Sequence, residues 1–123
     1  MMKRLLFSAF IMLFTGGLFA QVNFVSTDNV SPQTHADKVV KEIQAELNLD
    51  NSQAANIKSI TMDATSYIQR IADLKSTNPT QFKAKLESIV EEVDLKIYNI
   101  LEERQRVTFK ELIARPINTQ AGK

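Results

Sequence analysis

Glycine is almost absent from the chain beyond residue 20, and this scarcity limits the fold more than any other feature. The three glycines are Gly16, Gly17 and Gly122. Tight β-hairpin turns require residues that accept a positive φ, and glycine accepts it most readily. A chain without such residues has little material for hairpins, so the sequence predicts helices joined by few connections.

Residues 1–20 have the organisation of an export signal. The basic residues Lys3 and Arg4 precede an apolar run over residues 5–14, and the segment ends in the small residue Ala20. This order of basic start, apolar middle and small terminal residue is typical of a secretory signal peptide. We therefore expect cleavage after Ala20 and a protein that is exported, either periplasmic or secreted.

A membrane anchor is the alternative interpretation of this segment. Residues 5–20 are fewer than the roughly 20 apolar residues that cross a bilayer, so we expect no integral membrane span after cleavage. Lys3 and Arg4 are two of 15 basic residues, against 14 acidic ones, so the remaining chain has a balance of −1. This weak charge gives no argument for nucleic-acid binding. The chain has no cysteine, so helix packing or self-association must stabilise it.

Apolar spacing divides the rest of the chain into helices. Residues 21–33 are polar and aperiodic, which predicts a flexible arm, and a first helix is expected over residues 34–47. Asp50 then has the side chain of an N-cap, with Gln53 at the position of a capping-box partner. The second helix, over residues 51–75, has apolar residues alternately three and four apart, as in a coiled-coil seam: Ile57, Ile60, Ala64, Tyr67, Ile71 and Leu74.

The third predicted helix is the longest. Asn78 and Pro79 give a helix start signal, and every seventh residue from Leu86 is apolar as far as Ala114. One helix over residues 79–114, about 54 Å long, is the favoured interpretation. The alternative is a kink in the polar run 102–106.

These boundaries define the expected organisation. The helical domain covers residues 34–115, with a disordered tail over 116–123. The expected architecture is all-α, with three to four helices and a long antiparallel hairpin. A helix of about 54 Å would extend beyond its shorter partner and leave apolar seam exposed, which predicts a homodimer.

Catalytic and metal-binding patterns are missing from the sequence. His35 is the one histidine, and nucleophile–histidine–acid catalysis needs an oriented histidine, so we expect a surface side chain and no enzyme activity. Paired acids such as Glu87 and Glu91 are expected on solvated helix faces. Neither a cofactor nor a metal is expected. Acid–base pairs four residues apart are expected to form exposed ion pairs: Glu92 with Lys96, Glu102 with Arg106, and Glu111 with Arg115.

The last third of the long predicted helix combines basic and apolar side chains. Such a surface is a candidate contact site for a client or partner, although an ordinary amphipathic C-terminal helix explains the same pattern. The candidate surface consists of Arg104, Arg106, Val107, Phe109, Lys110, Leu112 and Ile113.

Two short motifs carry a resemblance to a known family. Leu49, Asp50 and Gln53 resemble the L-T-x-x-Q motif of the Spy/CpxP family of periplasmic helical proteins, with Asp50 in place of the capping threonine. Leu101 and Gln105 resemble a second copy. Glu102 is a poor N-cap residue, so we expect this second copy to lie within the continuous helix.

The resemblance implies a fold and a function. Members of that family form helical hairpins that pair into thin, curved dimers. Some hold unfolding proteins without ATP, and others restrain an envelope sensor kinase. We therefore expect an ATP-independent holding chaperone for unfolded or envelope proteins. The alternatives are a periplasmic inhibitor of a sensor kinase and a purely structural helical dimer.

Overall fold

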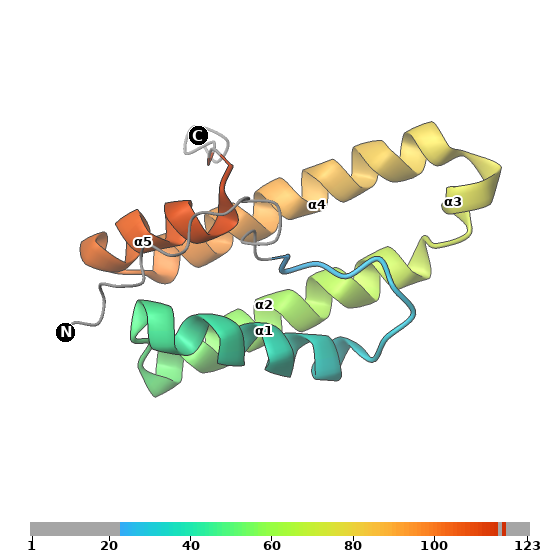
Figure 1. Cartoon of the computed structure of the whole chain (residues 1–123). Coiled ribbons are helices and arrows are strands. Elements are labelled where there is room, and N and C mark those ends of the chain that lie inside the picture. The colour runs from blue at the N-terminus through green and yellow to red at the C-terminus, as the bar shows by residue number, and fades with distance from the viewer. Residues whose placement is uncertain (1–22, 116, 118–123) are drawn as a thin grey trace, which may run out of the picture.

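The computed structural model describes residues 23–115 and 117, and within them all regular structure is helical (Figure 1). The five helices are α1 (Pro32–Leu47), α2 (Asn51–Arg70), α3 (Leu74–Thr77), α4 (Pro79–Ile100) and α5 (Glu103–Ile113). The all-α class predicted from the sequence is confirmed for this part of the chain. The predicted signal segment lies outside the described residues.

Helices α1 and α2 pack side by side and form the lower layer of the molecule in Figure 1. α1 begins two residues earlier than expected, because Ser31 is its N-cap and Pro32 supplies a preset φ at its first position. It ends at Leu47, and its C-cap Asn48 has the left-handed φ of 55° that asparagine tolerates better than most residues. Asp50 then caps α2, as predicted.

The end of the second helix was predicted wrongly. α2 stops at Arg70 rather than continuing to residue 75, and the short α3 follows after a turn. Around this turn the backbone bonds span three residues instead of four, as in the bond from Leu74 N–H to the carbonyl of Ile71 at 3.0 Å. Such tightening is common where a helix ends. α3 reverses the chain, and α4 returns along α2 (Figure 1).

The single helix predicted over residues 79–114 is wrong, and the alternative of a kink near residues 102–106 is closer. The chain leaves helical geometry at Leu101, with φ −92° and ψ 152°, and α5 starts at Glu103. α5 then folds back beside the C-terminal half of α4, where Arg106 and Lys110 lie over the ring of Tyr98. The seven-residue spacing of apolar residues from Leu86 continues across this break in the sequence. Val107 is a member of that series, but it is 62% exposed and lies in no coiled-coil seam.

Residues 23–30 form a non-helical segment, called the strap below, which lies between α2 and α4 (Figure 1). The prediction of a flexible arm is wrong for these residues. Phe24, Val25 and Ser26 are buried, and the Phe24 ring lies 5.8 Å from that of Phe109 in α5. An aromatic side chain buries a large apolar area, so Phe24 anchors the strap to the core. In the predicted tail, Ile117 packs against the core, and the other tail residues lie outside the described part.

Each of the four longer helices contributes one face to a shared hydrophobic core. The fully buried side chains that define it are Val39, Ile43, Ile57, Ile68, Val93, Ile97, Phe109 and Ile113. α5 and the strap together cover apolar surface that a straight hairpin would have left open. Among the described residues, Val107 is the one large hydrophobic side chain that is exposed.

Candidate functional site

Two glutamine side chains meet where α1 passes into α2 and α4 passes into α5. Gln53 Nε2 donates to Gln105 Oε1 at 2.8 Å, and Gln105 Nε2 donates to Gln53 Oε1 at 3.0 Å. Each oxygen also accepts from the N-cap of its own helix, from Asp50 N–H at 3.1 Å and from Glu102 N–H at 2.8 Å. We call this arrangement the glutamine pair.

Each glutamine donates its second amide hydrogen to a backbone carbonyl at the other junction. Gln53 Nε2 donates to the carbonyl of Ile100, at the end of α4, at 3.1 Å. Gln105 Nε2 donates to the carbonyl of Leu47, at the end of α1, at 3.0 Å. Terminal carbonyls of helices have no partner within the helix, so each glutamine completes the ends of two helices at once.

The five residues of the two L-x-x-x-Q motifs therefore lie at these two linked junctions. Leu49 and Leu101 are both buried, each immediately before the N-cap of α2 or α5. The expectation that the second copy would not start a helix is wrong, because α5 begins directly after Glu102. Glu102 is a weak N-cap by residue type, but the contacts of Gln105 to both junctions supply the stabilisation. The glutamine pair thus links the α1–α2 junction to the α4–α5 junction.

The candidate client surface on α5 is not a continuous surface. Phe109 and Ile113 are completely buried and belong to the core, and Leu112 is half-buried. Arg106 stacks over Tyr98 and donates to its carbonyl at 2.9 Å. Its guanidinium therefore stabilises the α4–α5 junction.

Arg104, Val107 and Lys110 are exposed. The sequence pattern did not distinguish the buried face of α5 from its exposed face, because residues 79–114 were interpreted as one helix with one continuous apolar seam. Only these three members of the predicted surface are open to a partner.

A buried ion pair was missed by the sequence reasoning. Arg115 was expected to pair with Glu111, but its Nε and a terminal nitrogen donate to the two carboxylate oxygens of Asp94 at 2.7 and 2.8 Å. Asp94 is 3% exposed. Burial raises the pKa of Asp94 above its ordinary value, even though the Arg115 guanidinium acts in the opposite direction. Of the three expected pairs at this spacing, Glu92 with Lys96 forms, at 2.9 Å.

A groove runs between α2 and α4 and has a volume of about 510 Å³. Ile60, Ala64, Tyr67, Ile89 and Val93 supply apolar lining. Its charged lining residues are Asp63, Lys85, Glu92 and Lys96. The groove thus joins apolar side chains, three of them partly exposed, to charges of both signs.

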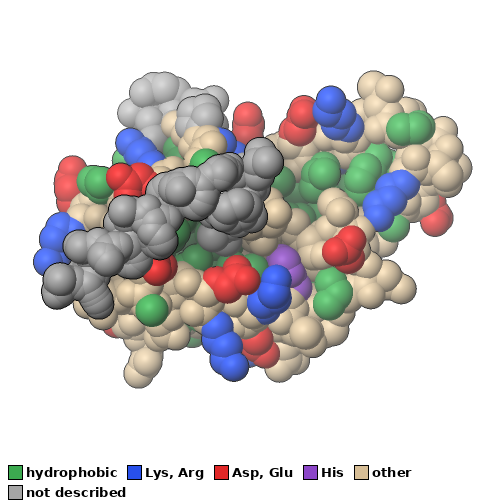
Figure 2. Space-filling view, in the orientation of Figure 1, with side chains coloured by type: hydrophobic (Ala, Val, Ile, Leu, Met, Phe, Trp, Pro, Cys, Tyr) green, Lys and Arg blue, Asp and Glu red, His purple; other side chains and the backbone are tan. Residues whose placement is uncertain are grey.

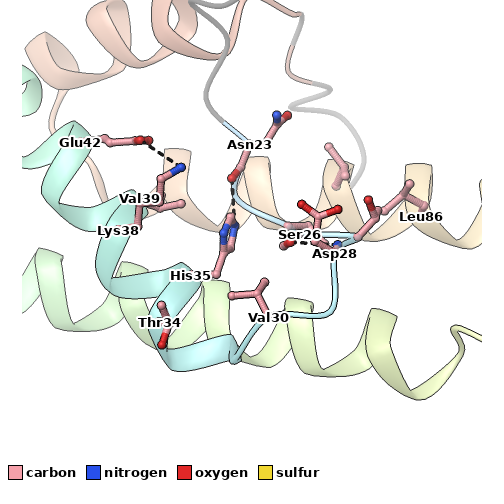
Figure 3. A pocket seen from close by; sticks show the side chains of 13 residues that line it. Asn23, Ser26, Asp28, Val30, Thr34, His35, Lys38, Val39, Glu42 and Leu86 are labelled. Carbon is pink, nitrogen blue, oxygen red and sulfur yellow. Dashed lines mark hydrogen bonds and ion pairs between the residues drawn. The ribbon is translucent and has the colours of Figure 1, made fainter.

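His35 has a partner that the sequence did not indicate. Its Nε2 lies 3.1 Å from the carbonyl of Asn23 in the strap (Figure 3). The side chain is partly buried. The described residues contain no cluster of three or more histidine or acidic side chains that could hold a metal. No described helix combines the length and apolar character that a membrane crossing requires.

Comparisons of the chain with protein-family models, with curated proteins and with solved structures gave no match. The resemblance to the Spy/CpxP family therefore rests on the two short sequence motifs alone.

Proposed function

We propose that this protein is an exported holding chaperone, which binds non-native polypeptides without ATP and keeps them from aggregating. The observation that carries the proposal is the groove between α2 and α4. Its apolar lining offers contact to exposed hydrophobic side chains of a client, and its charges of both signs attract chains of either charge during encounter. Partly buried side chains such as Ile60 and Ile89 can adapt to different clients.

Two sequence features support the proposed location and class. The N-terminal segment resembles a signal peptide, which would take the protein to a compartment outside the cytoplasm. The two L-x-x-x-Q motifs resemble those of a family that includes holding chaperones. A holding mechanism needs surface rather than chemistry, and the groove is a surface without a catalytic constellation among its lining residues.

Self-association remains part of the proposal. The argument from a long helix with an exposed seam no longer applies, because the helix breaks at Leu101 and α5 covers the seam. The groove is the surface that a second copy would cover, so a second copy and a client would compete for it. Light scattering coupled to size exclusion at micromolar concentration tests the homodimer, and a mass equal to one chain at all concentrations would refute it.

The chaperone proposal is tested by adding the protein, from Gln21 onward, to chemically denatured model substrates and following turbidity during refolding. Suppression at near-equimolar ratio is expected for several unrelated substrates. Ile89→Ser, in the groove, should weaken suppression several-fold at unchanged helicity. Val107→Ser is the matched control, because Val107 is exposed on α5 and lies outside the groove.

The outcomes separate the proposal from its alternatives. Loss for Val107→Ser but not for Ile89→Ser would place the contact on α5 rather than in the groove. No suppression of any substrate would refute the chaperone and favour either a regulator that binds one folded partner with fixed stoichiometry or a purely structural helical dimer.

A further inference from the structure

Four helix side chains bind the main chain of the strap. Thr65 Oγ1 in α2 accepts from the N–H of Ser26 at 3.4 Å. Lys75 Nζ donates to the carbonyl of Thr27 at 2.6 Å, and Gln69 Nε2 donates to the carbonyl of Val30. His35 contacts the carbonyl of Asn23 in the same way. Side chains from α1, α2 and α3 thus bind backbone groups, which every polypeptide carries.

Side-chain recognition of the strap is confined to one short stretch. Phe24 is 1% exposed and inserts beside Phe109, and Val25 and Ser26 follow it into the core. Thr27, Asp28 and Asn29 are exposed. The cleft that holds the strap therefore selects side chains at three positions: an aromatic, an aliphatic and a small residue. It constrains few other side chains of the segment.

The strap does not fill the space between α1 and α4. A cavity of about 800 Å³ lies beside it (Figure 3), and its wall includes Val39 and Glu42 of α1 and Leu86 and Val90 of α4. Figure 2 shows hydrophobic side chains gathered below α4 on this face, with charged side chains around them. A volume of this size is within the range of ligand sites, so there is room for a bulkier segment than the strap.

We propose that this cleft is a binding site for an extended segment of a non-native polypeptide, and that the strap is its displaceable internal occupant. The proposal rests on the proposed chaperone function and specifies the client: a chain with an aromatic residue followed by an aliphatic and a small one. Backbone hydrogen bonds supply affinity that does not depend on sequence, and the aromatic pocket supplies selectivity, as in other modes that recognise extended peptides.

Displacement of the strap exchanges equivalent interactions. A client segment would satisfy Thr65, Gln69 and Lys75 through its own main chain and would place an aromatic ring against Phe109. Because the contacts are equivalent, the strap competes with clients for the cleft. The apparent affinity for a client is the intrinsic affinity multiplied by the fraction of molecules in which the strap is displaced. It also shields the buried face of the cleft from water when no client is present.

A disulfide lock tests the proposal on the chain from Gln21 onward. The sequence has no cysteine, so Ser26→Cys combined with Thr65→Cys creates one defined pair at a place where strap and α2 are in contact. The probe is a fluorescent peptide with the sequence of residues 21–32. We expect the oxidised protein to bind it at least tenfold more weakly than the same protein after reduction.

Three controls make this result specific. Each single-cysteine variant should bind the peptide equally before and after reduction. A peptide with alanine in place of the residue equivalent to Phe24 should bind several-fold more weakly to the reduced protein. Circular dichroism must show equal helicity in both redox states, so that lost binding reports the closed cleft.

The outcomes distinguish this inference from the chaperone proposal. Equal peptide binding in the two redox states would overturn the inference, even if aggregation of model substrates is suppressed. Lock-sensitive peptide binding without suppression would refute the chaperone but retain the peptide site. If oxidation only converts a dimer to a monomer, with peptide binding unchanged, the cleft exchanges straps between copies and the inference is wrong.

Discussion

Gln53 and Gln105 satisfy each other's side-chain amides across the two helix junctions, with N–O distances of 2.8 and 3.0 Å. Each amide also binds one N-cap N–H and one terminal carbonyl. All hydrogen-bonding positions of both amides are thereby used. The glutamine pair ties the start of α2 to the end of α4 and the start of α5 to the end of α1, which explains why two distant motifs share the same residue.

Replacing Gln53 by glutamate should destabilise the protein by about 2–3 kcal/mol. A carboxylate keeps the shape but loses both donors, and it would face the carbonyl of Ile100 and Gln105 Oε1 without a hydrogen between them. Urea denaturation at pH 7 measures the loss. Part of the stability should return near pH 4, where the new carboxyl group becomes protonated and regains one donor.

A double-mutant cycle isolates the contact between the two amides. Gln53→Ala and Gln105→Ala should show a coupling free energy of about 1 kcal/mol or more, within the range for residues that share a network. Additive effects of the two substitutions would mean that the pair acts as two independent caps.

Asp50→Ala should cost about 1 kcal/mol of stability, within the range of about 0.5–2 for a lost N-cap. Asp50 Oδ1 accepts from the N–H of Gln53 at 2.7 Å, and alanine leaves that N–H without a protein partner. Asp50→Thr and Asp50→Ser should be nearly silent, because their hydroxyl groups accept the same bond. An unchanged denaturation midpoint in the alanine variant would contradict the assigned cap.

Local signals in the sequence predicted the parts of the fold that depend on neighbouring residues. The cap at Asp50, the start at Pro79 and the buried faces of α1 and α2 follow from spacing within one turn or two of helix. The break at Leu101 could not be predicted in this way. The break depends on contacts between Gln105 and Leu47 and between Arg106 and Tyr98. The apolar residues before and after it keep the same seven-residue spacing, so the sequence pattern shows no interruption there.

The candidate site was predicted less well, for a related reason. Phe109 was assigned to a candidate contact surface because basic and apolar side chains lie together in the last third of the predicted long helix. Once α5 folds back, Phe109 faces the core and meets Phe24 from the strap. The strap has no period of its own, and its burial comes from distant helices, so composition alone indicated a flexible arm.

Thr61→Val should stabilise the protein by about 1 kcal/mol. Thr61 is fully buried, and its Oγ1 has no hydrogen-bond partner among the described residues. Valine keeps the branched shape and removes the unsatisfied polar group. The matched control is Thr65→Val, one turn further along α2, where Oγ1 accepts from Ser26 N–H. That variant should lose stability, and thermal denaturation should therefore show shifts of opposite sign.

The Asp94 carboxyl group should titrate above its ordinary pKa of 3.8, because burial outweighs the attraction of Arg115. The folded state then binds a proton more tightly than the unfolded state. The stability from this group is fully present below pH 3.8 and is lost as the pH rises through the raised folded pKa. The carboxyl ¹³C shift of Asp94 against pH measures the midpoint directly.

Asp94→Asn provides the matching stability measurement. The amide does not titrate, so the acid limb that Asp94 contributes should disappear from the dependence of unfolding free energy on pH. If the Asp94 midpoint instead lies below 3.8, the bidentate contact with Arg115 dominates over burial. The sign then reverses: the ion pair stabilises the fold at neutral pH and is lost on acidification, and Asp94→Asn would cost most at pH 7.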